Sequence, residues 1–248
     1  MTVVTSSTGL RGLIVDWGGV LTAPLDTAMT QWAHQDGVDF EHFRDVMREW
    51  VGRPAPEEAG TPTDGVFAQV EATPDEGPAA NSPVHLLERG QITVEDFERE
   101  LALALSLRGS DVPERGLLTR LLSGLRDLSD DMLGVVRRAH RAGLRTALLS
   151  NSWGDTYPEH AWEGAFDAVV ISGRIGMRKP DAEIYLHTAD LLGLPAAACV
   201  MVDDLAHNVR GAVEAGMVGV LHRSFDETVS ELEALFELPL RPEGDRSG

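Results

Sequence analysis

Six residues in four short segments have side chains that could act together on an anionic substrate. They are Asp16, Ser150, Asn151, Lys179, Asp203 and Asp204. Three of the four segments follow a short apolar run such as Leu13-Ile14-Val15, which is typical of a buried strand. Because the carboxyl ends of parallel strands meet at one edge of a sheet, we expect these residues to converge there. The set would supply a nucleophilic carboxylate, a hydroxyl, a cation and a pair of carboxylates.

Two features favour chemistry over ordinary turn and cap roles for these residues. Lys179 is the only lysine in the chain, which otherwise uses arginine, and its ammonium is a compact charge that enters a crowded anion site. Asp203 and Asp204 repel each other at the end of a buried strand, which favours a bound divalent cation. Each residue alone could serve as a turn residue or a helix cap. The coincidence of all four segments favours a functional site.

The pattern of apolar residues predicts an α/β fold with a three-layer, Rossmann-like parallel sheet. Short apolar segments bounded by turn residues predict strands over 12–15, 145–149, 168–171, 199–202 and 218–221. Helical patterns lie between most of them, with Ser129 as an N-cap, Pro180 at the start of a helix and Gly193 at its end. From about residue 129 onward, strands and helices alternate, which is typical of a parallel sheet covered on both faces.

The alternation is absent between residues 22 and 125, where we expect a mainly helical inserted domain. Amphipathic patterns predict helices over 29–34, 40–50, 84–87 and 94–105. Residues 53–83 are rich in Pro, Gly, Glu and Thr, which predicts a mobile acidic loop. The expected domains are therefore an α/β core from 1–22 and 126–248 and a helical insertion from 23–125. We expect the polar tail from Pro239 to Gly248 to fray.

Composition narrows the class of partner. The formal net charge of -19 opposes binding to nucleic acid or to an anionic membrane surface, so we expect a small-molecule or protein partner. Residues 1–8 lack a basic region followed by an apolar core, and no apolar run approaches the length of a membrane span. We therefore expect a cytoplasmic protein. The oligomeric state stays open.

The ordered set of motifs resembles the haloacid dehalogenase superfamily, specifically members with a helical cap inserted after the first strand. Asp16 looks like the nucleophile of the first motif, Ser150 the hydroxyl of the second and Lys179 the lysine of the third. Asp203 and Asp204 look like the acidic pair of the fourth motif. The resemblance covers the expected core nearly from end to end.

This resemblance implies a Mg²⁺-dependent phosphatase that acts on a small phosphomonoester, with a sugar phosphate as one candidate, through an aspartyl-phosphate. It implies that Asp16, the Gly18 carbonyl and Asp204 hold the Mg²⁺, with Asp203 in support. Ser150, Lys179 and the Asn151 backbone would hold the phosphoryl oxygens.

One position departs from the pattern of the superfamily. Many of its phosphatases carry a second aspartate two residues after the nucleophile as general acid and base, and Gly18 occupies that position here. Two alternatives therefore stay open. One is a 2-haloacid dehalogenase, whose relatives also lack the second aspartate. The other is a catalytically impaired binding or regulatory module. Retention of Asp203 and Asp204 favours the metal-dependent reaction.

Overall fold

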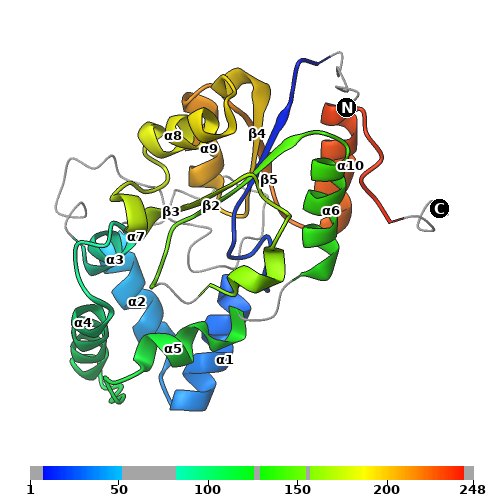
Figure 1. Ribbon diagram of the computed structural model, residues 1–248. Coiled ribbons are helices and arrows are strands. Elements are labelled where there is room, and N and C mark those ends of the chain that lie inside the picture. Colours follow the sequence, from blue (N-terminus) through cyan, green and yellow to red (C-terminus); the bar gives the residue numbers. More distant parts are fainter. Residues whose placement is uncertain (1–7, 52–81, 126–128, 155–156, 243–248) are drawn as a thin grey trace, which may run out of the picture.

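The structure is a computed structural model that describes residues 8–51, 82–125, 129–154 and 157–242. A parallel five-stranded sheet lies at its centre, in the order β3-β2-β1-β4-β5 (Figure 1). The strands are β1 (Gly12–Val15), β2 (Arg145–Ser150), β3 (Ala168–Ile171), β4 (Cys199–Asp203) and β5 (Val218–Leu221). All five lie where the sequence predicts them, although β2 and β4 each extend one residue further. The expected α/β fold class is confirmed.

The order of the strands explains why the site forms at the centre of the sheet. The chain adds β2 and β3 on one side of β1 and then returns to add β4 and β5 on the other side. The direction of winding therefore reverses between β1 and β4, and ligands in such sheets bind at the carboxyl ends of the strands flanking this point. Val15 at the end of β1 is paired with Val202 of β4, so Asp16 and Asp203 leave the sheet side by side.

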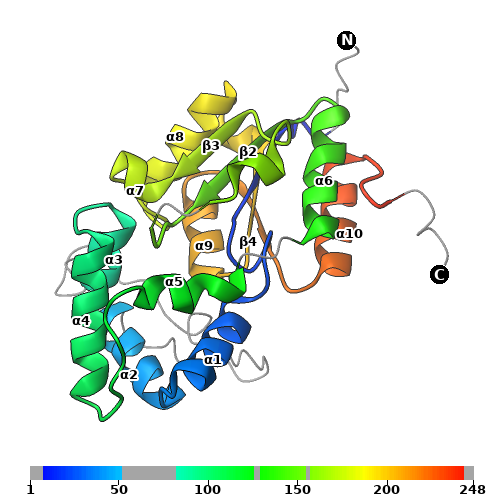
Figure 2. The ribbon, with the colours of Figure 1, turned by 60° about the horizontal axis from the view of Figure 1, so that its bottom comes forward.

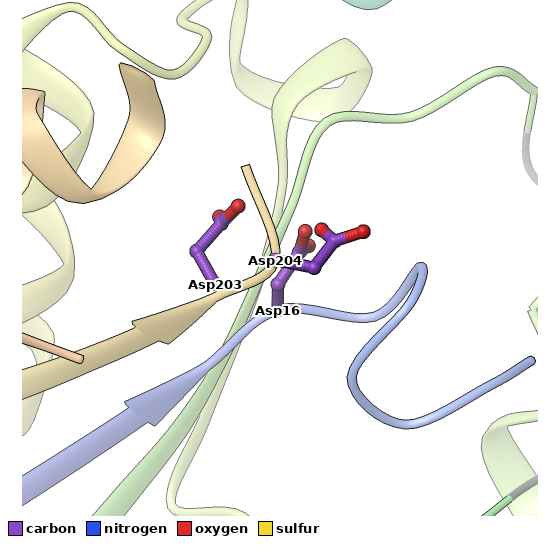
Figure 3. Close-up of side chains that lie close together, drawn as sticks. All are labelled: Asp16, Asp203 and Asp204. Atoms are coloured by element: carbon purple, nitrogen blue, oxygen red, sulfur yellow. The ribbon is translucent and has the colours of Figure 1, made fainter. Parts of the chain in front are cut away.

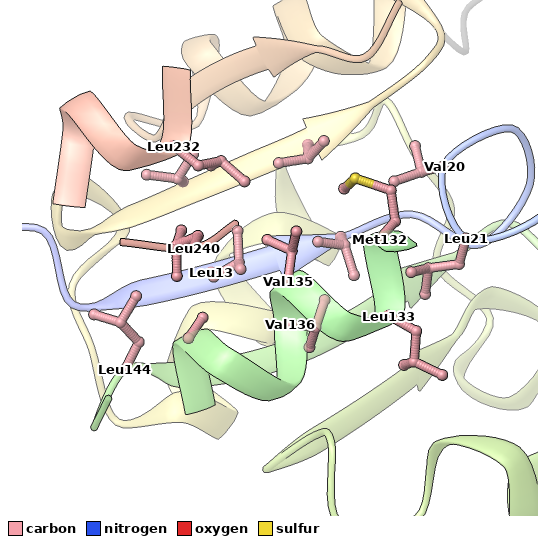
Figure 4. Close-up of a cluster of buried hydrophobic side chains, with 14 of the residues drawn as sticks. Leu13, Val20, Leu21, Met132, Leu133, Val135, Val136, Leu144, Leu232 and Leu240 are labelled. Atoms are coloured by element: carbon pink, nitrogen blue, oxygen red, sulfur yellow. The ribbon is translucent and has the colours of Figure 1, made fainter. Parts of the chain in front are cut away.

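Helices cover both faces of the sheet, as Figure 1 shows. One face carries α6 (Asp130–Arg141) and α10 (Phe225–Phe236), and the other carries α8 (Ala182–Leu192) and α9 (Ala206–Glu214). Along β1, Leu13 and Val15 belong to the apolar core under the first pair, which Figure 4 shows, whereas Ile14 belongs to the core under the second pair. Because alternate side chains point to opposite faces, a strand covered on both sides has to be apolar throughout.

A third apolar core lies in the helical insertion, by which we mean the described helices between β1 and α6. These helices are α1 (Leu25–Asp36), α2 (Phe40–Val51), α3 (Pro83–Glu88), α4 (Val94–Ser106), α5 (Leu117–Leu121) and the 3₁₀-helix η2 (Leu122–Leu125). Trp32, Phe43 and Phe97 are buried at its centre, and Trp32 packs edge-on against Phe43. The insertion packs as a group of helices of its own beside the sheet (Figure 2).

Short helices complete the chain, and the structure corrects several details of the predictions. These helices are α7 (Ser172–Ile175), η3 (Glu159–Trp162) and η4 (Ala196–Ala198). Together with α5 and η2, they are too short to leave a periodic pattern in the sequence. Ser129 caps α6 as predicted, its hydroxyl accepting from the Met132 N–H. The prediction that Pro180 starts α8 was wrong, because the helix begins at Ala182 with Asp181 as its N-cap.

Two expected mobile segments are only partly described. The predicted acidic loop at 53–83 lies outside the described residues except for Ser82 and Pro83, which begin α3, with Ser82 as its cap. In the tail, residues 243–248 are likewise outside them. The start of the tail does not fray, since Leu240 is fully buried and its N–H donates to Glu233.

Candidate active site

Three carboxylates meet at the carboxyl edge of the sheet. Figure 3 shows Asp16 after β1, Asp203 at the end of β4 and Asp204 next to it, all at the same edge. One oxygen from each lies within 4.8 Å of the others, and they form the one cluster of at least three potential metal ligands found in the described ranges. Carboxylates this close together repel unless a cation lies among them.

Lys179 supplies the cation on one side of this cluster. Its Nζ lies 2.8 Å from Oδ1 of Asp16 and 2.5 Å from Oδ2 of Asp203, and its side chain is fully buried. Burial by itself would lower the pKa of Lys179, but the charges of Asp16 and Asp203 outweigh it and raise that pKa. The ammonium therefore stays protonated and links the nucleophile position to β4.

Two asparagines hold this arrangement in place. The side chain of Asn151 accepts from the Lys179 N–H at 2.8 Å and donates to the Lys179 carbonyl at 3.0 Å, so it fixes the lysine backbone. Asn208 donates to Asp203 at 3.0 Å, and the Leu205 N–H donates to the same carboxylate at 2.9 Å. Because these partners and Lys179 occupy the Asp203 carboxylate, this residue chiefly positions the lysine.

Asp16 is buried, and its environment controls its charge. Burial raises the pKa of Asp16 to about 7, Lys179 opposes that rise, and Asp203 adds to it. The Trp17 N–H donates to Oδ1 of Asp16 at 2.6 Å and fixes the carboxylate. Burial also raises the pKa of Asp204 well above its usual range, with the charges of Asp203 and Asp16 adding to the effect. Both carboxylates would be ionised more readily beside a bound cation.

Asp204 is the carboxylate that best fits a metal. Its Oδ1 is buried and has no hydrogen-bond partner among the described residues, which is costly for an oxygen of this kind. Gly19 lies directly against it with a φ of +71°, and a Cβ at Gly19 would lie 2.1 Å from Oδ2 of Asp204. The glycine therefore provides both the left-handed turn and the space that this carboxylate occupies. A carboxylate with one unpaired oxygen, beside a second carboxylate, fits a hard divalent cation.

Ser150 lies at the end of β2, facing the same edge. Its hydroxyl is 2.9 Å from the Tyr157 hydroxyl, and both residues line the cavity above Asp16. Burial raises the pKa of Tyr157, so the phenol stays protonated and can orient the serine. Tyr157 could not be predicted from the sequence, because no spacing connects it to the other motifs.

A cavity of about 340 Å³ opens above the carboxylates, between the sheet edge and the helical insertion. All the predicted site residues line it except Asp203 and Asp204, which lie beside Asp16 at the same edge of the sheet. Asp16, Gly18, Ser150, Asn151 and Lys179 face it from the sheet side. The structure therefore brings the sequence-predicted residues together at one place.

A buried ion pair joins the insertion to the sheet at the wall of this cavity. Arg178 Nε donates to Glu88 of α3 at 2.7 Å, and both side chains are less than 10% exposed, at 7% and 9%. Trp153 also donates to Glu88, and the Ser172 hydroxyl donates to the Glu88 carbonyl. Sequence reasoning missed Glu88, since the pair lies 90 residues apart in the chain.

Comparison with known proteins identifies the family to which the chain belongs. A family model described as haloacid dehalogenase-like hydrolase matches residues 10–216. The chain belongs to this family and is one of its hydrolases.

Two phosphatases are among the proteins to which the chain is similar in sequence. The chain is 29% identical to sesquiterpene phosphatase astK of Aspergillus oryzae over 153 residues, covering 60% of this chain and 76% of that protein. It is 36% identical to mouse N-acylneuraminate-9-phosphatase over 95 residues, 36% of this chain and 38% of that protein. Two further relatives, drimenol cyclase drtB of Aspergillus calidoustus and rat bifunctional epoxide hydrolase 2, are longer, and the chain spans 30% of the length of each.

Among solved structures, an enzyme of this family from Bacteroides thetaiotaomicron, in complex with magnesium and inorganic phosphate, shares the fold. The TM-score is 0.52 at 18% identity, and the match covers 86% of this chain and 94% of that one.

In the described part of this chain, every helix is too short or too polar to cross a bilayer.

Proposed function

We propose that this protein is a Mg²⁺-dependent phosphatase that hydrolyses a small phosphomonoester through an aspartyl-phosphate on Asp16. The observation that carries the proposal is the convergence of Asp16, Lys179 and Asp204 at one sheet edge, with an unpaired carboxylate oxygen beside the nucleophile. Phosphoryl transfer depends mainly on positioning and on neutralising negative charge, and this arrangement supplies both.

Each residue has a role in this reaction. An oxygen of Asp16 attacks phosphorus and the bond from phosphorus to the leaving oxygen breaks. The leaving oxygen takes a proton from water and departs as the alcohol. Water then attacks the phosphorus of the aspartyl-phosphate, which releases inorganic phosphate and restores the Asp16 carboxylate. The ammonium of Lys179 and the hydroxyl of Ser150 would bind the phosphoryl oxygens and stabilise the charge that develops on them.

The metal would be held by Asp16, Asp204 and the carbonyl of Gly18, with Asp203 acting through Lys179. A bound Mg²⁺ neutralises charge on the phosphoryl group, which lets one anion approach another. Two phosphatases among the relatives and a magnesium complex among the structures of this fold support the proposal.

Gly18 bears on the rate of the proposed reaction. Without a carboxylic acid at this position, no aspartate two residues after the nucleophile protonates the leaving oxygen. A positioned acid is typically worth about 10²–10⁴ in rate. We therefore expect activated esters, such as aryl phosphates, to be hydrolysed faster than alkyl phosphates.

The experiment that tests the reaction class compares two kinds of substrate. The wild-type protein is assayed for phosphate release from a panel of phosphomonoesters with Mg²⁺, and for halide release from a 2-haloacid without it. Metal-dependent phosphate release supports the proposal. Halide release alone would establish a dehalogenase instead, and binding of phosphomonoesters without turnover would indicate a binding module.

A further inference from the structure

The cavity above the catalytic carboxylates is apolar over most of its wall. Leu25, Met29, Val84 and Leu122 face it from the helical insertion, and Trp153 and Leu205 face it from the sheet side. These residues belong to the core cluster of the insertion or pack against it. The part of a substrate that lies beyond the phosphoryl group would therefore contact hydrocarbon and indole surfaces.

Most polar side chains of the wall are already paired with one another. Glu88 accepts from Arg178 and Trp153. Tyr157 is hydrogen-bonded to Ser150. In addition, the side-chain amide of Asn208 donates to both carboxylate oxygens of Asp203. These groups are occupied in holding the site together, and few remain to meet the hydroxyl groups of a ligand.

This wall discriminates between classes of alcohol. A sugar carries several hydroxyl groups, and each one buried without a partner weakens binding by about tenfold or more. By contrast, each methylene group that leaves water for an apolar wall strengthens binding by roughly three- to fourfold. The volume of about 340 Å³ lies within the range of about 300–1,000 Å³ that is usual for small-molecule sites.

We propose that this cavity selects phosphomonoesters of apolar alcohols, such as alkyl or aryl monophosphates, over sugar phosphates. The inference rests on the proposed phosphatase function and names the substrate class of the same site. Leu122 of η2 is the best residue to test, because it lines the cavity and is only partly buried.

The test uses n-hexyl phosphate, ethyl phosphate and glucose 6-phosphate, which are all esters of primary alcohols. Hexyl phosphate has four more methylene groups than ethyl phosphate, so with Mg²⁺ we expect its kcat/KM to be higher by about 80- to 250-fold when all four are buried. It should also exceed kcat/KM for glucose 6-phosphate. Equal or higher kcat/KM on glucose 6-phosphate would overturn the inference. Acetyl phosphate, which is activated and has almost no apolar part, tests the phosphatase function separately.

A binding measurement keeps the two claims distinguishable. Hexylphosphonate and methylphosphonate are not hydrolysed, and calorimetry gives their affinities for the wild-type protein whether or not it turns over. Tighter binding of hexylphosphonate with no hydrolysis of acetyl phosphate would support the apolar site and refute the phosphatase. Equal affinity for the two phosphonates would refute the apolar site.

Matched leucine variants localise the effect. We expect Leu122→Gln to lower the ratio of kcat/KM for hexyl over ethyl phosphate by about tenfold. The control is Leu103→Gln, on the outer side of α4, where the side chain is 55% exposed and does not line the cavity. This control should leave the ratio unchanged, and a similar fall in both variants would contradict the assignment of the cavity.

Discussion

Replacing Gly19 by alanine separates backbone strain from displacement of the carboxylate beside it. Gly19 has a φ of +71°, and an alanine there costs about 1–2 kcal/mol in the left-handed region. Gly37, at the end of α1, has nearly the same φ of +70°, but a Cβ there meets nothing within 4 Å. The variants Gly19→Ala and Gly37→Ala therefore carry similar strain, and only the first crowds Asp204.

The displacement of the Asp204 carboxylate in Gly19→Ala can be worked out from the distance between the new Cβ and this carboxylate. The new Cβ would lie 2.1 Å from Oδ2 of Asp204, whereas a carbon and an oxygen normally stay about 3.3 Å apart. The carboxylate would have to move by about 1 Å, which is far more than Mg²⁺ coordination tolerates. A displacement of that size at a reacting centre can cost about 100-fold in rate.

Two assays measure these effects separately. Urea denaturation without Mg²⁺ should show that Gly37→Ala loses about 1–2 kcal/mol of unfolding free energy and that Gly19→Ala loses at least as much. Phosphate release as a function of Mg²⁺ concentration should show a loss of at least about 100-fold for Gly19→Ala and near wild-type behaviour for Gly37→Ala. If both variants retain the same activity and the same requirement for Mg²⁺, Asp204 does not hold the metal.

Three further variants test other parts of the site. Glu88→Gln leaves the buried Arg178 without its counter-charge and should lower the unfolding free energy by about 3 kcal/mol in urea denaturation. The double variant Glu88→Gln/Arg178→Met should recover part of that loss. If the losses of the two single variants simply add in the double variant, the pair is not coupled. Burial lowers the pKa of His207 to about 4, so the folded state binds fewer protons than the unfolded state and stability falls as the pH drops below about 6.5. Between pH 7 and pH 5 the wild type should therefore lose about 1–2 kcal/mol more than His207→Asn, and parallel stability curves would contradict a buried neutral imidazole. At Gly18, a Cβ would make only an ordinary contact of 3.4 Å with the side chain of Leu25, so Gly18→Asp should fold. This variant should raise kcat about tenfold or more on an alkyl phosphate, with little change on an aryl phosphate. An equal change on both esters would show that protonation of the leaving group does not limit the rate of the wild type.

The sheet could be predicted from the sequence because its strands are covered on both faces. Gly12–Val15 and Cys199–Asp203 are short, mainly apolar runs that are buried along their whole length, and burial on both sides leaves little room for other patterns. The same property makes the site recognisable in the sequence, since Asp16 directly follows one such run and Asp203 ends another. Segments that face water on one side, by contrast, can hold many combinations of polar and apolar residues, so their sequences predict the structure less clearly.

The contacts that hold the site together could not be predicted in the same way. Asn151 pairs with the backbone of Lys179 across 28 residues, and Glu88 pairs with Arg178 across 90. Neither pair has a local pattern, because each forms only when distant segments fold against each other. Leu240 illustrates the same point, since its burial against the core is invisible in a polar tail.

The most direct test of the central claim is phosphate release from an activated aryl phosphate by the wild type and by Asp16→Asn, each with Mg²⁺ and with a chelator. We expect turnover only for the wild type with Mg²⁺, because the Asp16 carboxylate is proposed both as the nucleophile and as a ligand of the metal. Hydrolysis that persists in Asp16→Asn, or that is unaffected by the chelator, would contradict it.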